Sequence, residues 1–431
     1  MTITALYVLY AVVSFAFMAI AATTLAWMLH AWRTPASLER TSFDAGGGHP
    51  RHSFSLVVPA RHEEAVLDHT LTRLCQMDHP DFEIVVVVGD DDPATREVAE
   101  AVAERRPDCV RVVEDVAQPK NKPRALNAAL PHCTGEVVGV FDAEDDVHPR
   151  LLAHIDECLT QTGADVVQSG VQLMNFDSSW FSVRNVLEYY FWFRSRLHFH
   201  AEQRFIPLGG NTVFVRTDLL WSVGGWDATC LAEDCELGVR LSARGANVVV
   251  AYEPSLVTRE ETPHTLRALA RQRTRWNQGY LQTLRRGEWR KLPPGQRALG
   301  FYTLAMPFLQ AFAGVMIPIS IATILYAKVP LGLALASFLP LIPTLTLVAV
   351  EIAGLGDFCR EYGLRARPRD YARLVLGTFP YQWVLAVAAV RAAVRELLGV
   401  RDWKKTAHKG AHLSSTELAD VAMTRRIEAG G

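Results

Sequence analysis

The sequence predicts an α/β domain flanked by apolar helices that cross a membrane. Three observations support this fold class. The chain has 431 residues, of which 49% are hydrophobic, so it is long enough for more than one domain and is not disordered. Apolar runs alternate with helix-like segments in residues 53–260, a pattern typical of parallel sheets covered by helices on both faces. Uncharged stretches of about 20 residues or more lie on either side of that region.

The first element is an apolar segment. Residues 1–30 are predicted to form an N-terminal transmembrane anchor, because Met1–Leu29 carries no ionisable side chain. A cleaved signal peptide is the alternative, but this segment lacks a basic start and exceeds the apolar run of about 7–15 residues that such peptides use. Basic residues follow the segment and none precedes it. The positive-inside rule therefore places the next domain in the cytoplasm, beneath the plasma membrane.

A linker is predicted over residues 31–52, where three successive glycines form a short flexible run. The α/β domain is predicted over residues 53–260. In such a sheet, ligands bind beyond the carboxyl ends of the strands, so the residues after each apolar run are candidate site residues. The four expected strands are Phe54–Val58, Ile84–Val88, Val110–Val113 and Val137–Phe141. The helix-like segments between them are Glu63–Gln76, Thr95–Glu104 and Arg124–Ala129.

Two clusters of carboxylates follow strands of this predicted sheet. Asp90-Asp91-Asp92 follows the second run, and Asp142-Ala143-Glu144-Asp145-Asp146 follows the fourth. A solvated acidic loop would explain one such cluster, but two clusters at strand ends of one sheet are better explained by a bound cation. Carboxylate oxygens suit Mg²⁺ or Mn²⁺, which can bridge a protein carboxylate to a diphosphate. Lys122 would add positive charge nearby.

Several other function classes are disfavoured. The chain has 44 Lys and Arg against 46 Asp and Glu, so its net charge of −2 gives no basic surplus for binding nucleic acid. It contains neither GxxxxGK(S/T) nor GxGxxG, which disfavours a P-loop ATPase and the usual dinucleotide-binding domain. Its seven cysteines show no CxxC pair and no zinc-ligand spacing, which indicates reduced thiols in a cytosolic compartment.

Six short motifs occur in a fixed order along the chain. They are Pro59-Ala60-Arg61-His62-Glu63, Asp90-Asp91-Asp92, Lys122-Pro123-Arg124-Ala125-Leu126-Asn127, Asp142-Ala143-Glu144-Asp145, Glu233-Asp234 and Gln272-Arg273-Thr274-Arg275-Trp276. In content and order they resemble the inverting, membrane-embedded glycosyltransferases typified by cellulose synthase, hyaluronan synthase and chitin synthase. The last motif matches QxxRW, which is specific for processive members. The resemblance covers about Phe54 to Leu284 and implies a GT-A (Rossmann-like) fold and a nucleotide-sugar donor.

The resemblance implies a role for each motif. Asp234 is the expected catalytic base, and Glu233 is expected to position it. Asp142 would hold Mg²⁺ or Mn²⁺ together with Glu144 or Asp145, because Glu144 stands at the third position of the DxD motif. The acceptor is expected to contact Gly210, Asn211, Gln272 and Trp276. The nucleotide is expected to contact Pro59, Arg61, Glu63, Asp90, Asp91, Asp92, Lys122, Asp142, Arg273, Arg275, Trp403 and Thr406.

Structural explanations compete with some of these roles. Asp234 would also suit the first turn of a helix, where the helix dipole stabilises a carboxylate. Trp276 would also suit an interfacial helix, and Gly210 a tight turn. Gly89 stands where many relatives have the first acidic residue, so which acid of Asp90–Asp92 meets the base is left open.

Further membrane-associated segments are predicted in the second half of the chain. Residues 261–297 are predicted to form an interfacial helix that carries QxxRW, and residues 298–353 to form two transmembrane helices. Val183–His200 is rich in aromatic and arginine side chains. A position at the bilayer surface is therefore expected for it, in preference to a place in the core.

The last segments raise a conflict about sidedness. Residues 372–398 form a third C-terminal segment, which is expected to be re-entrant or interfacial because it is short and contains Pro380. The tail, residues 399–431, resembles a segment with which relatives cover the nucleotide, through Trp403 and Thr406. That role requires a cytoplasmic tail. The alternative is four complete spans with an external tail.

The sequence therefore predicts an inverting β-glycosyltransferase that moves a sugar from a nucleotide sugar to a growing polysaccharide at the cytoplasmic membrane face. UDP is the expected nucleotide. One alternative is a single addition to a lipid acceptor such as a polyprenyl phosphate, because the membrane part is small for a polymer channel. Another is a catalytically silent membrane scaffold, which the intact carboxylates disfavour. The expected partners are the donor, a glycan or lipid-linked acceptor and the membrane; a homo-oligomer is left open.

Overall fold

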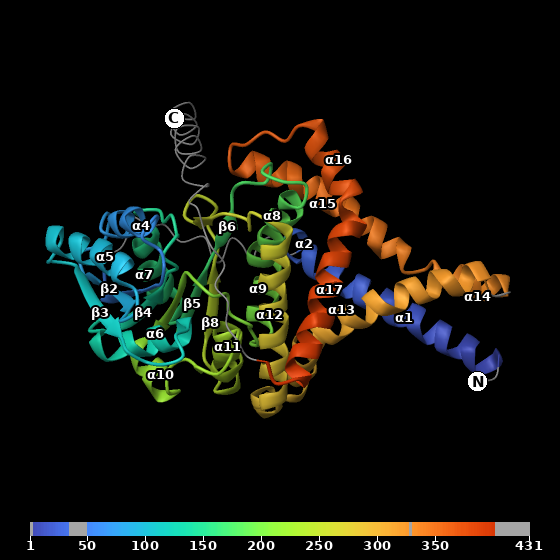
Figure 1. Cartoon of the computed structure of the whole chain (residues 1–431), viewed down its shortest axis with the longest axis horizontal. Helices are drawn as coiled ribbons and strands as arrows, with labels where there is room; N and C mark the ends of the chain where they lie inside the picture. The colour runs from blue at the N-terminus through green and yellow to red at the C-terminus, as the bar shows by residue number, and fades with distance from the viewer. Residues whose placement is uncertain (1–2, 34–49, 327–329, 401–431) are drawn as a thin grey trace.

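A seven-stranded sheet forms the centre of the α/β domain (Figure 1). The computed structural model describes residues 3–33, 50–326 and 330–400. The strand order is β3-β2-β1-β4-β7-β5-β8, and a separate two-stranded sheet pairs β6 with β9. The strands are β1 (Phe54–Ala60), β2 (Phe82–Gly89), β3 (Val110–Asp115), β4 (Val137–Val140), β5 (Val166–Ser169), β6 (Val171–Leu173), β7 (Val213–Arg216), β8 (Val248–Ala251) and β9 (Thr258–Glu260).

The predicted parallel strands are confirmed in the first half of the domain. β1 pairs in parallel with both β2 and β4, and β2 pairs in parallel with β3. The sheet as a whole is mixed, because β7 runs antiparallel to both β4 and β5. β1 and β2 are mostly apolar because both of their faces are buried, and each contains one polar side chain, Ser55 and Glu83.

Helices cover the two faces of the sheet around two separate hydrophobic cores. α4, α5 and α7 pack on one face, around Leu71 and Ile155. α6, α8 and α11 pack on the other, and Phe358 of α15 joins this second core. The helices between residues 30 and 243 are α2 (His30–Arg33), α4 (Leu67–Leu74), α5 (Pro93–Arg105), α6 (Lys122–Ala129), η1 (Leu130–His132), α7 (Leu151–Thr162), α8 (Ser182–Phe191), η2 (Trp192–Arg196), α9 (Leu197–Glu202), α10 (Thr217–Ser222) and α11 (Glu233–Ala243).

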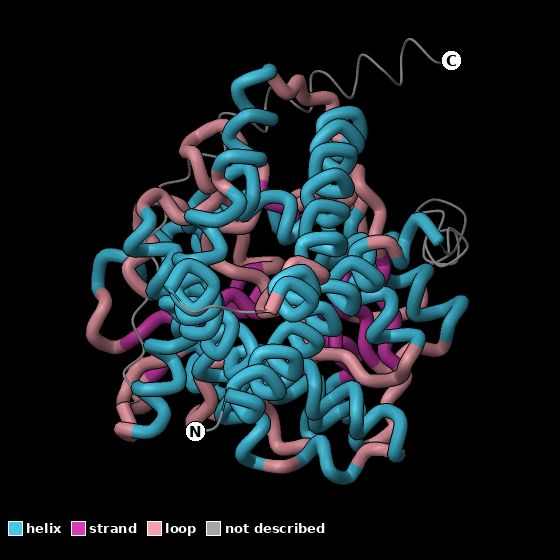
Figure 2. The backbone as a smooth tube through the Cα atoms, turned by 90° about the vertical axis from the view of Figure 1, so that its right-hand side faces the viewer, coloured by secondary structure: helices cyan, strands magenta, loops and turns pink. Residues whose placement is uncertain are grey.

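Among the described residues, three stretches are long and apolar enough to cross a membrane: Tyr10–Met28, Pro294–Thr323 and Leu331–Glu361. They extend away from the sheet, toward the right of Figure 1. Figure 2, viewed from that side, shows helices in front of the strands. The helices concerned are α1 (Ile3–Met28), α13 (Pro294–Tyr326), α14 (Leu331–Ser337) and α15 (Leu341–Glu361).

The last two helices form a bent pair. α16 (Pro368–Leu376) and α17 (Thr378–Leu397) meet at an angle of 48°, as in a broken span or a re-entrant loop. α17 packs against α12 (Leu266–Arg286) and α13, and the short η3 (Glu288–Lys291) precedes α13. Pro380 does not interrupt α17, because it lies in the first turn, where a missing N–H removes no helical hydrogen bond. The number of spans and the side of the tail stay predictions.

The expectation that Val183–His200 lies at the bilayer surface is wrong. This segment forms α8, the π-helical turn η2 and α9, and most of its apolar side chains lie in the hydrophobic core. Val183, Tyr190 and Leu197 are at most 1% exposed. Aromatic side chains suit a core as well as a bilayer surface, and two of the three arginines in this segment, Arg184 and Arg194, form ion pairs with carboxylates of α15. Composition alone therefore could not separate the two environments.

Candidate active site

A cavity of about 670 Å³ opens beyond the carboxyl ends of β1 and β4. Its polar wall comes from residues that follow these strands and from the N-termini of α6 and α11. The predicted site residues that line it are Pro59, Arg61, Glu63, Lys122, Asp142, Glu144, Gly210, Asn211, Glu233, Asp234, Gln272, Arg273, Arg275 and Trp276. The predicted residues within the described ranges that do not line it are Asp90, Asp91, Asp92 and Asp145. Trp403 and Thr406 lie outside the described residues.

Lys122 connects the end of β4 to the loop before β7. The side chain of Asn121 caps α6, which places Lys122 in the first turn of that helix. Its Nζ donates to the backbone oxygen of Gly210 at 2.7 Å and forms an ion pair with Asp142. Burial acts to lower the pKa of Lys122, but the charges of Asp142 and Glu233 outweigh it and raise that pKa above its ordinary value. A fixed positive charge therefore lies near both predicted carboxylate sites.

Glu233 and Asp234 begin α11, as the sequence predicts. The Oδ1 atom of Asp234 accepts a hydrogen bond from the backbone N–H of Cys235 at 2.8 Å. Burial raises the pKa of Asp234. Burial, followed by the charge of Asp234, raises the pKa of Glu233 to about 7. Two neighbouring carboxyl groups with raised pKa values in a cavity are suited to general acid–base chemistry.

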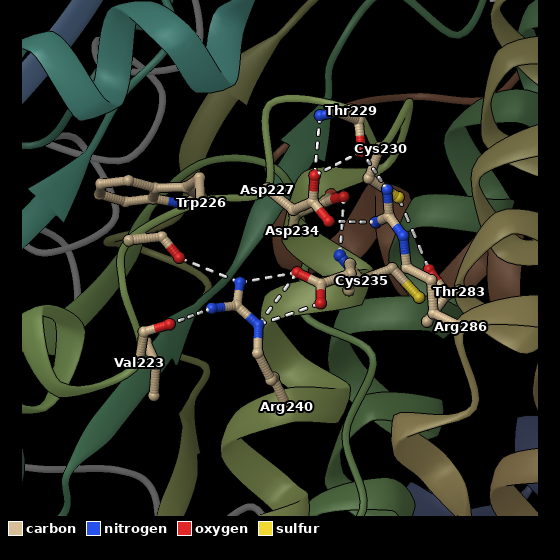
Figure 3. Close-up of polar contacts among 12 residues, drawn as sticks. Val223, Trp226, Asp227, Thr229, Cys230, Asp234, Cys235, Arg240, Thr283 and Arg286 are labelled. Atoms are coloured by element: carbon tan, nitrogen blue, oxygen red, sulfur yellow. Dashed lines mark hydrogen bonds and ion pairs between the residues drawn. The ribbon is translucent and has the colours of Figure 1, made fainter.

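The loop that leads into Asp234 is held by two helices (Figure 3). Arg240 of α11 donates to the backbone oxygen of Val223 at 2.6 Å. Arg286 of α12 forms an ion pair with Asp227 at 2.9 Å. Side chains of two helices thus hold the loop that precedes α11 at Val223 and at Asp227.

The predicted metal motif divides into a cavity-facing part and a buried part. Asp142 and Glu144 line the cavity. Asp145 is fully buried, and its carboxylate accepts hydrogen bonds from the backbone N–H of Asp142 at 2.8 Å and from Asn211 Nδ2 at 3.0 Å. Burial, followed by the charge of Glu260, raises the pKa of Asp145 well above its ordinary value. Asp145 therefore holds the loop that follows β4 in place through hydrogen bonds and does not line the cavity.

The donor set of the cavity fits a cation that is shared with a ligand. Within the described ranges, no group of three or more His, Cys, Asp or Glu side chains is arranged to hold a metal ion. Asp142 and Glu144 offer two carboxylates at the cavity wall. Mg²⁺ is commonly bound in this way, by one or two carboxylates with substrate phosphates and water completing the coordination.

The three acids after β2 do not line the cavity. Asp90 forms an ion pair with Lys120 at 2.6 Å, and Asp91 forms one with Arg61 at 2.7 Å. Asp92 caps the N-terminus of α5. Lys120 and Arg61 both line the cavity, so two of the acids hold cations at its edge. Sequence reasoning missed Lys120, although it stands two residues before the motif lysine. The contact of these acids to a nucleotide base stays a prediction.

The QxxRW motif lies on α12 and faces the same cavity. Arg273 forms an ion pair with Glu188 of α8, and its guanidinium lies 4.3 Å from the ring centroid of Trp276. Arg275 donates to a backbone oxygen of the loop before α11 at 3.3 Å. The Oε1 atom of Gln272 has no hydrogen-bond partner within the described part of the chain. Arg273 is thus already neutralised, and its contact to the diphosphate stays a prediction.

The cavity continues from these polar groups to the apolar helices. α1 contributes Ile20, Thr24 and Trp27, all within its candidate span. α13 contributes Met306, Gln310 and Ala313, also within a candidate span. One cavity therefore has a polar end at the sheet and an apolar arm between α1 and α13.

Comparison with known proteins decides the family. The model of the glycosyltransferase like family 2 matches residues 50–279, which is more than half of the chain. The chain belongs to this family. The acids at the strand ends, the start of α11 and the QxxRW motif all lie within the matched residues of this family 2 chain. The predicted enzyme class, a glycosyltransferase that uses a nucleotide sugar, is confirmed, and so is a GT-A-like α/β fold.

Relatives of this family 2 glycosyltransferase include two proteins named beta-monoglucosyldiacylglycerol synthase. The one from Synechocystis sp. is 27% identical over 394 residues, which covers 86% of this chain and 78% of the relative. The one from Nostoc sp. is 30% identical over 237 residues, which covers 53% of this chain and 49% of the relative. The mannosyltransferase PcManGT from Pyrobaculum calidifontis, solved in complex with GDP-Man and Mn²⁺, shares the fold, with a TM-score of 0.59. It is 20% identical, and the match covers 91% of this chain and 99% of that one.

Proposed function

We propose that this family 2 glycosyltransferase transfers a single sugar from a nucleotide sugar to a membrane lipid, with inversion to the β-anomer. The observation that carries the proposal is the continuity of the cavity, from Asp142 and Asp234 to the apolar arm between α1 and α13. A lipid can place its acyl chains in that arm and its head group beside Asp234 without exposing the chains to water. The names of the two relatives support a lipid acceptor.

The donor would bind at the sheet end of the cavity. Asp142 and Glu144 are the residues to hold Mg²⁺ or Mn²⁺, because both line the cavity. When bound, the cation supplies positive charge that stabilises the diphosphate leaving group. Lys122 adds a second, permanent positive charge at the same place, since its ammonium group contacts Asp142. Lys120 and Arg61 extend this positive wall toward the nucleotide.

The acceptor hydroxyl would bind at Asp234. This carboxylate lies at the cavity surface, and burial raises its pKa, so it is a suitable base for a hydroxyl proton. Glu233 is the more buried neighbour. We assign it to pairing electrostatically with the positive charge of Lys122. Trp276 offers an aromatic face for a sugar ring, and Gln272 an amide for its hydroxyl groups.

Extension of a polysaccharide is the second candidate function. The presence of QxxRW at the cavity wall favours it, because that motif resembles the one of processive synthases. A single lipid addition remains the first candidate, because most of the side chains that α1 and α13 contribute to the arm are apolar, with Thr24 and Gln310 as the polar exceptions. Such a lining offers a growing glycan few hydrogen-bonding partners.

The distinguishing experiment measures the product directly. Purified protein in neutral detergent is incubated with Mn²⁺, with diacylglycerol or a polyprenyl phosphate as the lipid, and, in turn, with radiolabelled UDP-glucose, UDP-galactose and GDP-mannose. We expect label in the organic phase, and a mass spectrum that shows the lipid plus one hexose. Water-soluble label of high mass would instead establish polymer extension, and the absence of any sugar–lipid product with every donor would reject the proposal. Asp142→Asn serves as the inactive control.

A further inference from the structure

Arg196 lies where the catalytic core meets the apolar helices. It ends η2, the π-helical turn between α8 and α9, and it lines the cavity. Its guanidinium carbon lies 4.1 Å from the ring centroid of Trp27 on α1 and 4.8 Å from that of Trp192. Tyr280 of α12 and Tyr302 of α13 both act to raise the pKa of Arg196. Two indole rings therefore hold this guanidinium at the junction of four structural elements.

Neighbouring arginines have acidic partners, but Arg196 has none within residues 3–33, 50–326 and 330–400. On the same helical segment, Arg184 forms an ion pair with Glu351, and Arg194 forms one with Glu361. The Nε atom of Arg196 is buried and has no hydrogen-bond partner in the same ranges. The contrast separates two arginines that hold the fold together from one whose donors remain available in the cavity.

A cation in this position needs a counter-charge. Burial lowers the pKa of Arg196 to about 10, and the phenols of Tyr280 and Tyr302 offset the decrease only in part, so the side chain is still charged at neutral pH. Arg196 is half-buried, with its Nε atom fully buried, and a guanidinium in such a place is costly without an anion. Its planar fork matches phosphate oxygens. Stacking on indole leaves the N–H edges of the guanidinium free to donate.

We propose that Arg196 binds the phosphate group of a membrane lipid that occupies the apolar arm of the cavity. The inference deepens the proposed function, on which it rests, by giving that lipid an anionic group. Arg196, Tyr280 and Asp234 line the same cavity, so the phosphate and the proposed base would occupy one continuous space. The same chemistry has two sources: a phosphate on the acceptor, or an anionic phospholipid beside a neutral acceptor.

The first measurement tests binding without transfer. The affinities of dihexanoyl phosphatidic acid and dihexanoyl glycerol are measured on the purified full chain in neutral detergent. We expect the wild-type protein to bind the phosphatidic acid at least about tenfold more tightly. Arg196→Gln should lose this preference, and Arg196→Lys should retain part of it, because lysine keeps the charge but not the fork. Arg33→Gln, which removes the same charge from an exposed position just after α1, should retain the full preference.

The second measurement identifies the source of the phosphate. Transfer is measured in phosphatidylcholine vesicles that contain diacylglycerol, with and without phosphatidylglycerol, and in vesicles that contain a polyprenyl phosphate. Stimulation by phosphatidylglycerol that Arg196→Gln abolishes assigns the phosphate to a separate lipid. Glycosylation of the polyprenyl phosphate, with a KM for that lipid that rises in Arg196→Gln while the donor KM is unchanged, assigns it to the acceptor.

Two results would overturn the inference: equal affinity of the wild-type protein for the two short-chain probes, or a preference that persists in Arg196→Gln. If Arg196→Gln does not fold, the wild-type preference and its reduction in Arg196→Lys decide. Because the binding measurement needs no sugar transfer, its outcome is independent of whether the product is a glycolipid. A failure of the inference is thereby distinguished from a failure of the proposed function.

Discussion

Gly210 lies directly against the carboxylate of Asp234: a Cβ atom added at residue 210 would lie 3.1 Å from Asp234 Oδ2. The backbone oxygen of the same glycine accepts a hydrogen bond from Lys122 at 2.7 Å. Gly210, in the loop before β7, thus contacts both the proposed base, Asp234, and the ammonium group of Lys122, which pairs with Asp142. A side chain at this position would disturb the proposed base first.

We expect Gly210→Ala to lower kcat by about tenfold, because the added methyl group pushes the Asp234 carboxylate aside by a few tenths of an ångström. Nucleotide affinity should be unchanged. The measurement is the transfer rate beside donor affinity. Gly295→Ala is the matched control, since an added Cβ there meets no atom within 4 Å. An unaltered kcat in Gly210→Ala would show that the position of Asp234 does not limit the reaction.

Asp142→Asn should reduce transfer by about 10²-fold or more, because it removes a proposed ligand of the cation that stabilises the leaving group. The fold should survive, since Asp142 lies at the cavity wall. Mn²⁺-dependent binding of the nucleotide and the transfer rate are measured together. Asp108→Asn, at an exposed ion pair outside the cavity wall, is the control. Undiminished turnover at ordinary Mn²⁺ concentrations contradicts the metal assignment.

Asp234→Asn keeps the size of the side chain but cannot accept a proton, so it should cost about 10²–10⁴ in rate. Nucleotide binding should survive, because Asp142, Glu144 and Lys122 are untouched. Glu233→Gln should cost less. Transfer rate and nucleotide affinity of both variants give the comparison. If Asp234→Asn transfers sugar at nearly the wild-type rate, or loses nucleotide binding as severely as Asp142→Asn, the base lies elsewhere.

The pH dependence of kcat at saturating donor should have an acidic limb above the range of an ordinary aspartate, about 4. Burial raises the pKa values of Asp234 and Glu233, so the base is protonated and inactive at low pH, and activity appears as pH rises through the raised value. Glu233→Gln should move the limb to lower pH, because it removes a neighbouring negative charge. A limb that lies near 4 in the wild-type protein would disprove the burial argument.

Arg184 and Glu351 join α8 to α15 through two hydrogen bonds of 3.0 and 2.9 Å. Arg184→Met should lower the free energy of unfolding by about 3–5 kcal/mol, because it leaves a carboxylate without a partner in a largely buried place. Adding Glu351→Leu should restore part of the loss. Thermal unfolding in detergent measures both variants.

The control for this pair is Arg105→Met, which breaks an ion pair with Asp68 at the protein surface. We expect no measurable change in its unfolding, because both side chains are more than half exposed. A loss in Arg184→Met no larger than in Arg105→Met would mean that the buried pair does not hold the core to α15.

The sequence was sufficient to predict the parallel strands β1 to β4 and the acidic residues that follow their carboxyl ends. Continuous apolar runs predicted β1 to β4, and the order of the motifs predicted which residues follow their carboxyl ends, because strand ends of one parallel sheet share an edge. Asp234 was expected in the first turn of a helix and lies there. These features depend on local pattern and on the order of elements, both of which are read along the chain.

Partners distant in the sequence could not be predicted. Arg273 was expected to be available for a diphosphate, but it is paired with Glu188, which lies on another helix. Val183–His200 was expected at the bilayer surface, but most of its apolar side chains lie in the core, and α15 supplies carboxylates to two of its arginines, Arg184 and Arg194. The sequence could not distinguish Arg196 from Arg184 and Arg194. The difference is that those two arginines pair with carboxylates of α15 and Arg196 does not, which only the fold reveals.

The most direct test of the lipid-acceptor account measures transfer to diacylglycerol in Ala313→Trp, which places an indole in the apolar arm of the cavity. The account predicts a fall of at least about tenfold in lipid glycosylation, with donor affinity unchanged, because only the acceptor's path is obstructed. Ala322→Trp, at an exposed position farther along α13, should transfer sugar at the wild-type rate. Wild-type lipid glycosylation by Ala313→Trp would contradict the claim that the acceptor reaches Asp234 through this arm.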